Sequence, residues 1–278
     1  MIDVGPTTIV VGIDGSATSM RAARFARTYA DARGLRVVGI VVATDVLGLG
    51  RDDTVDTKTH DALVAKVSEA LTEAGLVLDS LSVGIGHPAE VLTSLASPSA
   101  ALIVGARGIG GFSALLLGST TSACLAHARC PVFVIPHQDR APEVPYGRIC
   151  VGIDRSAGAI AALRWAVDEA STRPGCEVHA ISAWRTPHLW EPLQGSPEHY
   201  EGRARHDLEA AMRALGDVPV IVTSATKEAN AAQALIEESA RSDLVVLGND
   251  RREGGRFDAS ATPVAVASHS SSPVVIVP

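Results

Sequence analysis

The sequence contains few aromatic side chains and no surplus of positive charge. Only 4% of its 278 residues are aromatic whereas 46% are hydrophobic, so small aliphatic side chains dominate any core that the chain can build. This composition favours parallel strands covered by helices over an aromatic-rich β-sandwich. The formal net charge of −7 argues against a protein that holds DNA or RNA by neutralising phosphates. We therefore expect a folded α/β protein with no nucleic-acid partner.

Several motifs and segments are also missing. The four cysteines form no Cys-x-x-Cys pair, which argues against the usual zinc sites and disulfide frameworks. No run reaches the roughly 18 consecutive apolar residues of a membrane span, and residues 1–6 are not a cationic segment leading into a long apolar run. These absences predict reduced structural thiols, no metal site, no membrane partner and a cytoplasmic location.

The chain contains one unit twice. Residues 10–16 read VVGIDGS, and residues 150–156 read CVGIDRS. The ends of the two copies match as well, with CPVFVIP at residues 130–136 and SPVVIVP at residues 272–278. We expect two domains, residues 1–138 and 147–278, joined by a polar, proline-containing linker at residues 139–146.

Within each copy, short apolar runs alternate with segments of helical periodicity. In the first copy the runs lie near residues 8–14, 37–42, 80–85, 101–104 and 132–135, and the segments between them carry helix signals such as Ser16 and Pro88. Such alternation is typical of βαβ units. Each domain is therefore expected to be a doubly wound, five-stranded, mainly parallel sheet with helices on both faces.

Glycine-rich turns follow the fourth predicted strand of the first copy, and they are the best candidates for a ligand site. In open parallel sheets, ligands bind beyond the carboxyl ends of the strands, where the strand order reverses. Gly105 and Gly108 carry no Cβ, so their amides can approach phosphate oxygens, and Arg107 adds a positive charge. Gly118-Ser119-Thr120 then opens a helix whose free amides favour an anion. The alternative is that these glycines serve only the turn.

The spacing Gly105-x2-Gly108-x9-Gly118-Ser119 resembles the universal stress protein family, and more closely the ATP-binding branch of its tandem two-domain members. The opening VGID strand and the closing CPVFVIP segment support this resemblance, which spans essentially the whole chain. The resemblance implies an adenine nucleotide alpha hydrolase-like fold with ATP as the ligand, accompanied by Mg²⁺ or Mn²⁺. It also implies that Asp14 lies beside the nucleotide and that the backbone of Val42 meets adenine.

The resemblance further assigns the phosphate and ribose loop to six residues: Gly105, Arg107, Gly108, Gly118, Ser119 and Thr120. Two of the implied roles have plainer alternatives. On the plainer alternative Asp14 would merely cap the helix that follows it, and Val42 on its chemistry alone would be a core residue.

The second copy departs from this pattern. Gly248-Asn249-Asp250-Arg251 places an arginine where the second glycine stands, Ala261-Thr262-Pro263 replaces Gly118-Ser119-Thr120, and Ala183 replaces Val42. We expect one strong nucleotide site, in the first domain, and a degenerate second one. Two alternatives stay open: Arg251 and Arg252 restore phosphate binding through their side chains, or the retained Asp154 keeps an adenosine contact.

The function implied by the resemblance is that of an ATP-binding, nucleotide-sensing regulator of a stress response. It would act through nucleotide-dependent contacts with an unidentified protein partner, and homodimerisation stays open. No P-loop motif occurs, and none of the three lysines lies in the candidate site, so no catalytic residue is expected. A slow ATPase or phosphotransferase using the same site, and a nucleotide-free scaffold, are the alternatives.

Overall fold

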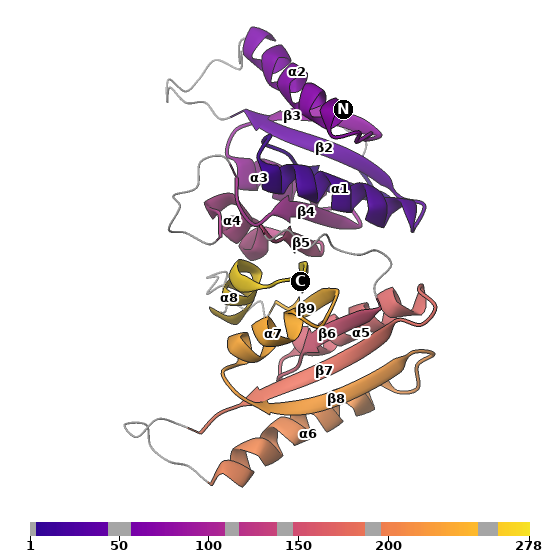
Figure 1. The fold of residues 1–278 in the computed structure, drawn as a ribbon, viewed down its shortest axis with the longest axis vertical. Helices are drawn as coiled ribbons and strands as arrows, with labels where there is room; N and C mark the ends of the chain where they lie inside the picture. The colour runs from indigo at the N-terminus through magenta and orange to yellow at the C-terminus, as the bar shows by residue number, and fades with distance from the viewer. Residues whose placement is uncertain (1–3, 44–56, 109–116, 138–146, 187–195, 250–260) are drawn as a thin grey trace. The chain divides into compact units, whose positions relative to one another are not determined.

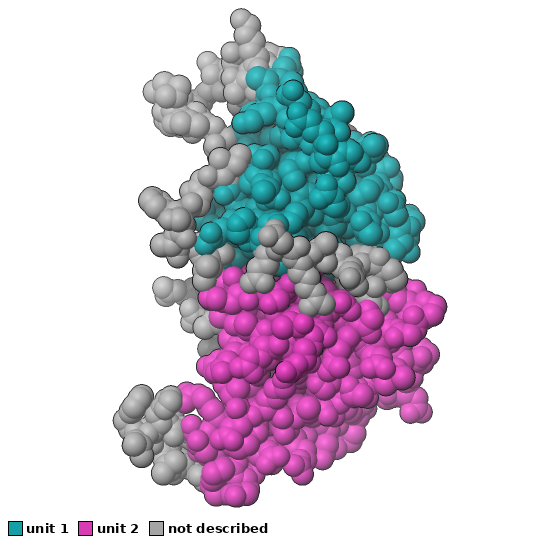
Figure 2. Space-filling view, in the orientation of Figure 1, with its two compact units in different colours: residues 1–139 teal, residues 140–278 magenta. Residues whose placement is uncertain are grey.

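The computed structural model describes residues 4–43, 57–108, 117–137, 147–186, 196–249 and 261–278. The chain divides into two compact units, unit 1 (Met1–Asp139) and unit 2 (Arg140–Pro278), which Figure 2 colours separately. Each unit contains one sheet region of five parallel strands with helices against it, as the alternating pattern predicts (Figure 1).

Unit 1 has the strand order β3-β2-β1-β4-β5, and every pair within it is parallel. The order reverses between β1 and β4, so the connections that follow these two strands lead to opposite faces of the sheet. Its elements are β1 (Thr8–Gly12), α1 (Ala17–Asp31), β2 (Arg36–Ala43), α2 (Thr57–Glu73), β3 (Ser80–Ile85), α3 (Pro88–Ala96), β4 (Ala101–Gly105), α4 (Ser119–His127) and β5 (Val132–Ile135).

Two glycines show that α1 and α3 cover opposite faces of this sheet. A Cβ on Gly105 would lie 2.9 Å from the backbone carbon of Thr18 in α1, whereas a Cβ on Gly12 would lie 3.0 Å from a methyl of Leu92 in α3. The latter position is also 3.5 Å from Val104, the residue before Gly105. Because successive side chains of a strand point to opposite faces, α1 and α3 must lie on different sides.

The first helix begins and buries its apolar face as the sequence predicts. Ser16 is the N-cap of α1, and its side chain accepts a hydrogen bond from the amide of Ser19. Ala22, Phe25, Ala26 and Tyr29 are each at most 5% exposed. Strand β1 is shorter than the predicted run 8–14, because the chain leaves the sheet after the amide of Ile13 donates to the carbonyl of Ile40.

Unit 2 repeats this topology, with the strand order β8-β7-β6-β9-β10 and parallel pairing throughout. Ser156 caps the first helix of the unit as Ser16 does in unit 1. The elements are β6 (Arg148–Gly152), α5 (Ala157–Ser171), β7 (Glu177–Trp184), α6 (Pro197–Leu215), β8 (Ile221–Glu228), α7 (Ala231–Ser239), β9 (Leu244–Gly248), α8 (Ala261–His269) and β10 (Val274–Val277).

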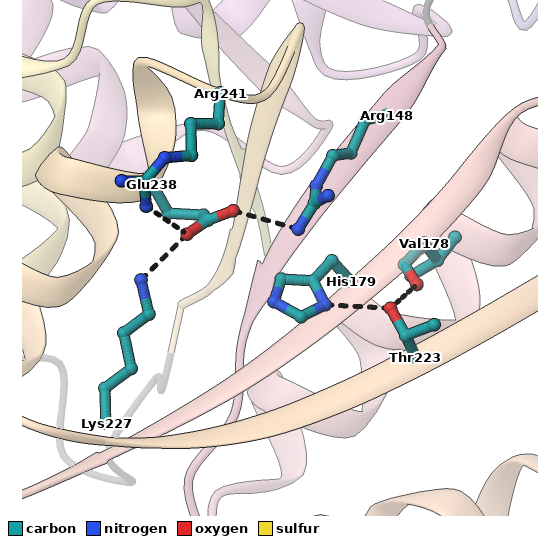
Figure 3. A network of polar contacts seen from close by, with 7 residues as sticks. All are labelled: Arg148, Val178, His179, Thr223, Lys227, Glu238 and Arg241. Atoms are coloured by element: carbon teal, nitrogen blue, oxygen red, sulfur yellow. Dashed lines mark hydrogen bonds and ion pairs between the residues drawn. The ribbon is translucent and has the colours of Figure 1, made fainter.

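A buried carboxylate distinguishes the interior of unit 2. The side chain of Glu238 on α7 is 4% exposed and forms ion pairs with Lys227 at 2.8 Å, Arg148 at 3.0 Å and Arg241 at 3.8 Å (Figure 3). Burial works to raise the pKa of the Glu238 carboxyl, but the hydrogen bond and charge of Lys227 and the charge of Arg148 outweigh it, so the pKa is lowered. The cluster therefore holds an ionised carboxylate between strands and helix.

Next to this cluster, His179 on β7 makes a hydrogen bond of 2.8 Å between its Nδ1 and the hydroxyl of Thr223 on β8 (Figure 3). Burial and the neighbouring Arg148 lower the pKa of His179. In the matching register of unit 1, Val38 pairs with Ser80, so the first copy carries an apolar side chain where the second carries the imidazole.

The contact between β3 and α3 in unit 1 is packed differently from the matching contact between β8 and α7 in unit 2. In unit 1, a Cβ on Gly84 would overlap a methyl of Val91 on α3. The matching positions of unit 2 are Lys227, which pairs in register with Ala183 as Gly84 pairs with Val42, and Ala234 on α7. Removing the valine methyls gives the lysine stem room to reach Glu238.

Candidate functional site

The candidate site of unit 1 lies where β1 and β4 end, at the point where the strand order reverses. Asp14 follows β1, residues 106–108 follow Gly105 at the end of β4, and α4 begins at Ser119. The structure thus brings three of the predicted segments to one edge of the sheet. Residues 109–116, between the glycine turn and the start of α4, lie outside the described part of the chain.

Asp14 is exposed and holds the turn between β1 and α1. Its Oδ1 accepts a hydrogen bond of 2.9 Å from the amide of Ser16, and its own amide donates to the hydroxyl of Ser19 at 3.3 Å. The alternative expectation was that Asp14 caps helix α1. The N-cap of α1 is Ser16 instead. The second oxygen, Oδ2, lies so close to Gly108 that a Cβ there would overlap it.

The loop after β4 is anchored to the start of α1. The hydroxyl of Thr18 donates to the carbonyl of Arg107, and the hydroxyl of Ser16 donates to the same oxygen at 3.5 Å. Neither contact was expected from the sequence, although Ser-x-Thr shortly after the aspartate is a visible signal. The two hydroxyls fix the backbone at the half-buried Arg107 and bring Gly108 against Asp14.

A side chain would meet different neighbours at each glycine of the predicted phosphate loop. Gly105 lies where α1 packs on β4, since a Cβ there would be 2.9 Å from the Thr18 backbone, so this glycine serves helix packing. A Cβ on Gly108 would overlap Oδ2 of Asp14, the end of an exposed side chain that would then have to turn away. At Gly118, by contrast, a Cβ would find its nearest neighbour, the carbonyl of Ala106, at an ordinary 3.5 Å. The fold itself therefore leaves room for a side chain at Gly118.

The N-terminus of α4 has no side-chain cap. Gly118 is the N-cap residue, with extended backbone at φ −71 and ψ 150, and no side chain of the described residues accepts from the first turn in its place. The amide of Gly118 donates to Ala106 at 2.8 Å, and the hydroxyl of Thr121 donates to the carbonyl of Gly105 at 2.8 Å. Ser119 is exposed and Thr120 half-buried, so their hydroxyls lie at the open end of the helix.

Val42 presents backbone rather than side chain to this edge. Ile40 faces β1, because its carbonyl accepts from Ile13, and Ala43 faces β3, because its carbonyl accepts from Gly86. Peptide groups alternate in direction along a strand, so the N–H and C=O of Val42 point toward β1, beyond the last register pair Gly12–Ile40. This strand edge offers one donor and one acceptor side by side.

Among the described residues, neither a cluster of metal ligands nor a reactive thiol accompanies this edge. Within the described ranges, no three His, Cys, Asp or Glu side chains come together as a metal site. All four cysteines are buried and free, as the sequence predicts. Burial raises the pKa of Cys124 and of Cys150 to about 12, which keeps both as unreactive thiols.

Comparison with known proteins decides the family. The model of the Universal stress protein family matches residues 6–136 and, a second time, residues 145–278. The chain belongs to the universal stress protein family. Universal stress protein MT2052 of Mycobacterium tuberculosis is 30% identical over 300 residues, covering 96% of this chain and 94% of the relative. Universal stress protein Mb2028c of Mycobacterium bovis is 30% identical over 269 residues, covering 88% of each chain.

The fold of the family is seen in solved structures as well. The crystal structure of a universal stress protein from Archaeoglobus fulgidus superposes with a TM-score of 0.70 at 18% identity, covering 98% of each chain. At that identity the match establishes the fold alone. Two universal stress protein domains thus follow one another along the chain, and none of the described helices is long and apolar enough to cross a membrane.

The expected loop of the second domain is only partly within the described residues. Asp250, Arg251 and Arg252 lie outside them, whereas Pro263 lies in α8. Both α4 and α8 have nine residues and end in histidine, which places Pro263 opposite Thr121 and not opposite Thr120 as the sequence match had it. The hydroxyl that Thr121 gives to Gly105 therefore has no counterpart in unit 2.

Proposed function

We propose that unit 1 binds ATP and that the chain is a nucleotide-sensing regulator of a stress response in the cytoplasm. Its occupancy by nucleotide would change its contacts with a protein partner. The observation that carries this proposal is the uncapped N-terminus of α4, which faces the edge formed by Asp14, Arg107 and Gly108. Backbone amides at a helix start are a ready site for phosphate.

The residues at this edge fit the parts of the nucleotide. The donor and acceptor of Val42 suit the hydrogen-bonding edge of adenine. The first-turn amides of α4, the hydroxyls of Ser119 and Thr120 and the charge of Arg107 suit phosphates. Asp14 would lie beside the ribose or the divalent ion, Mg²⁺ or Mn²⁺, that accompanies a triphosphate. The ion would be held mainly by phosphate oxygens and water.

Binding is favoured over catalysis because the edge offers little acid-base chemistry. An ATPase or phosphotransferase needs a group that orients or deprotonates the attacking water or hydroxyl. Asp14 is the acidic residue predicted for the site, and one of its oxygens is engaged by the amide of Ser16 while the other lies against Gly108. Slow hydrolysis would be incidental to binding.

The test uses the empty side-chain position at Gly118. Its backbone angles suit an N-cap residue, so Gly118→Asp would place a carboxylate on the first-turn amides of α4. The Gly118→Asp variant should keep or slightly raise the unfolding temperature, yet lose at least about tenfold in ATP affinity by titration calorimetry, because the carboxylate occupies and repels the phosphate position. Gly118→Asn is the matched control without the charge and should weaken ATP binding less.

Unchanged ATP affinity in the Gly118→Asp variant would overturn the proposal, as would the absence of any ATP affinity in the unaltered protein. Chromatography of nucleotide released on denaturation provides a second measurement. About one ATP per chain is the expected result, since the glycine spacing that we expect to bind phosphate occurs in the sequence of unit 1 and is altered in that of unit 2.

A further inference from the structure

Unit 2 contains a cavity of about 380 Å³ at the carboxyl ends of β6, β7 and β9. This volume lies within the roughly 300–1,000 Å³ of small-molecule sites. Helix α6 and the first residues of α7 and α8 contribute to its lining, together with the end of β7. The chemistry of this lining determines which ligand the cavity can recognise.

One wall is an open strand edge. The amide of Ile153 donates to the carbonyl of Ile181 at 2.7 Å, and the amide of Ala229 donates to the carbonyl of Trp184 at 2.8 Å. By strand alternation, the N–H and C=O of Ala183 point toward β6, beyond the last register pair Gly152–Ile181. Ala183 lines the cavity, so an adjacent donor and acceptor are offered to a planar ligand edge.

A second wall is one stripe of α6. Tyr200, Arg203, Ala204 and Asp207 all line the cavity and follow the spacing i, i+3, i+4, i+7, which places them on one face of the helix. Within the described residues, the side chains of Arg203 and Asp207 form neither a hydrogen bond nor an ion pair. Tyr200 and Trp184, both half-buried, add aromatic surface.

This polar stripe belongs to unit 2 alone. Arg24 donates to the carbonyl of Ala74, and Arg164 donates in the same way to Ala214, which fixes the correspondence of the helices α2 and α6. By that correspondence Leu63 and Val67 stand where α6 has Arg203 and Asp207. Val67 is 2% exposed and packs in the core of unit 1. The matching residue of unit 2, Asp207, lines the cavity instead.

The cavity is poorly suited to a polyphosphate. Pro263, in the first turn of α8, lines it and has no amide proton to offer an anion. Among the lining side chains, the carboxylates of Asp154 and Asp207 balance the guanidinium groups of Arg185 and Arg203. A net charge of zero and a helix start with one donor fewer favour a ligand without a large negative charge.

We propose that unit 2 binds a neutral nucleoside, with the heteroaromatic ring on the backbone edge of Ala183 and the sugar hydroxyls donating to Asp207. A carboxylate is a common acceptor for ribose hydroxyls in α/β folds. The aromatic faces of Trp184 and Tyr200 supply apolar contact for the ring. This inference goes beyond the proposed function, because it concerns the other unit and a ligand without a triphosphate.

The test uses adenosine and a reporter inside unit 2. The protein is labelled with 5-fluorotryptophan, and the Trp184 resonance is assigned by its loss in a Trp184→Phe variant. Adenosine should shift this ¹⁹F resonance saturably, and the shift should persist when excess ATP is present. Asp207→Asn should weaken the adenosine affinity by about tenfold, because a charge-assisted hydrogen bond is lost.

Two matched controls separate binding from folding. Glu209→Gln alters an exposed carboxylate of the same helix that is outside the lining and should leave the adenosine affinity unchanged. Ala231→Leu fills the cavity from the first turn of α7 and should abolish the shift, whereas Ala232→Leu, one residue on and outside the lining, should not.

The proposal is overturned if adenosine leaves the Trp184 resonance unmoved, if ATP displaces it, or if Asp207→Asn binds as the unaltered protein does. The adenosine measurement is independent of the proposal that unit 1 binds ATP. If the protein has no ATP affinity, adenosine should still shift the Trp184 resonance. If unit 1 binds ATP, the absence of an adenosine shift would still overturn the proposal for unit 2.

Discussion

Replacement of Glu238 should destabilise unit 2 much more than replacement of its neighbours, and unit 1 shows how the loss can be repaired. The Glu238 side chain is 4% exposed, and its carboxylate forms ion pairs with Lys227 at 2.8 Å and Arg148 at 3.0 Å (Figure 3). Removing one member of a fully buried ion pair costs about 3–5 kcal/mol, whereas an exposed pair contributes about 0–1 kcal/mol. The side chains of Lys227 and Arg148 are 25% and 38% exposed, so water can partly reach them after the change.

We therefore expect Glu238→Leu to lower the free energy of unfolding by about 2 kcal/mol, between the buried and exposed limits. Urea unfolding followed by tryptophan fluorescence measures this directly, because all three tryptophans lie within unit 2. Glu237→Leu is the matched control. Glu237 is exposed and its carboxylate accepts a hydrogen bond from Gln233, so its replacement should change the stability by less than about 0.5 kcal/mol.

A triple variant then tests whether the cluster acts as a coupled unit. Lys227→Gly, Ala234→Val and Glu238→Leu together install the residues that unit 1 has at Gly84, Val91 and Leu95. Because the unpaired lysine is removed and the apolar contact restored, the triple variant should be more stable than Glu238→Leu alone by at least about 1 kcal/mol. If its losses simply add, or if Glu238→Leu behaves as Glu237→Leu does, the cluster contributes no coupled stability.

Three further outcomes are expected. Gly105→Ala should lower the free energy of unfolding by about 1–3 kcal/mol in thermal or urea unfolding, because its Cβ meets the Thr18 backbone, while Gly5→Ala, with open space around it, should be neutral. The pKa of His179 is lowered in the fold, so the unfolded chain binds more protons below about pH 6.5, and stability should fall as the pH drops from 7.5 to 5.5. His179→Val should flatten that pH dependence, and an unaltered slope would contradict the assignment. Ellman's reagent at pH 8 should find no fast-reacting thiol in the native protein and four after unfolding, since burial holds all four thiols protonated; a fast native thiol would contradict this for Cys124, Cys130, Cys150 and Cys176.

Local patterns were sufficient for most of the fold. The apolar runs predict the five strands of unit 1 to within about two residues, and Ser16 and Pro88 begin their helices as expected. The repeat itself predicts that unit 2 has the same topology. These features depend on residues that are close in the sequence, where periodicity and capping carry the information.

Contacts across long stretches of sequence were not predictable in the same way. The hydroxyl of Thr18 donates to the carbonyl of Arg107, 89 residues away, and the local Ser-x-Thr signal does not say which distant carbonyl accepts. The sequence predicts that Gly105 approaches a ligand. The close approach of α1 is by itself enough to explain why a glycine stands at this position. Of the three glycines of the predicted phosphate loop, only Gly118 has no close neighbour among the described residues that a Cβ would displace, so a substitution there tests ligand binding with the least disturbance of the fold.

The exchange of Gly84 and Val91 for Lys227 and Ala234 also bears on how the two halves of the gene can evolve. A crossover that combined β3 of unit 1 with α7 of unit 2 would leave Glu238 without its lysine, and the reverse hybrid would drive a lysine stem into the methyls of Val91. Recombination between the copies is therefore penalised at this junction. Once such a paired difference is established, each half accumulates its own substitutions without being overwritten by the other.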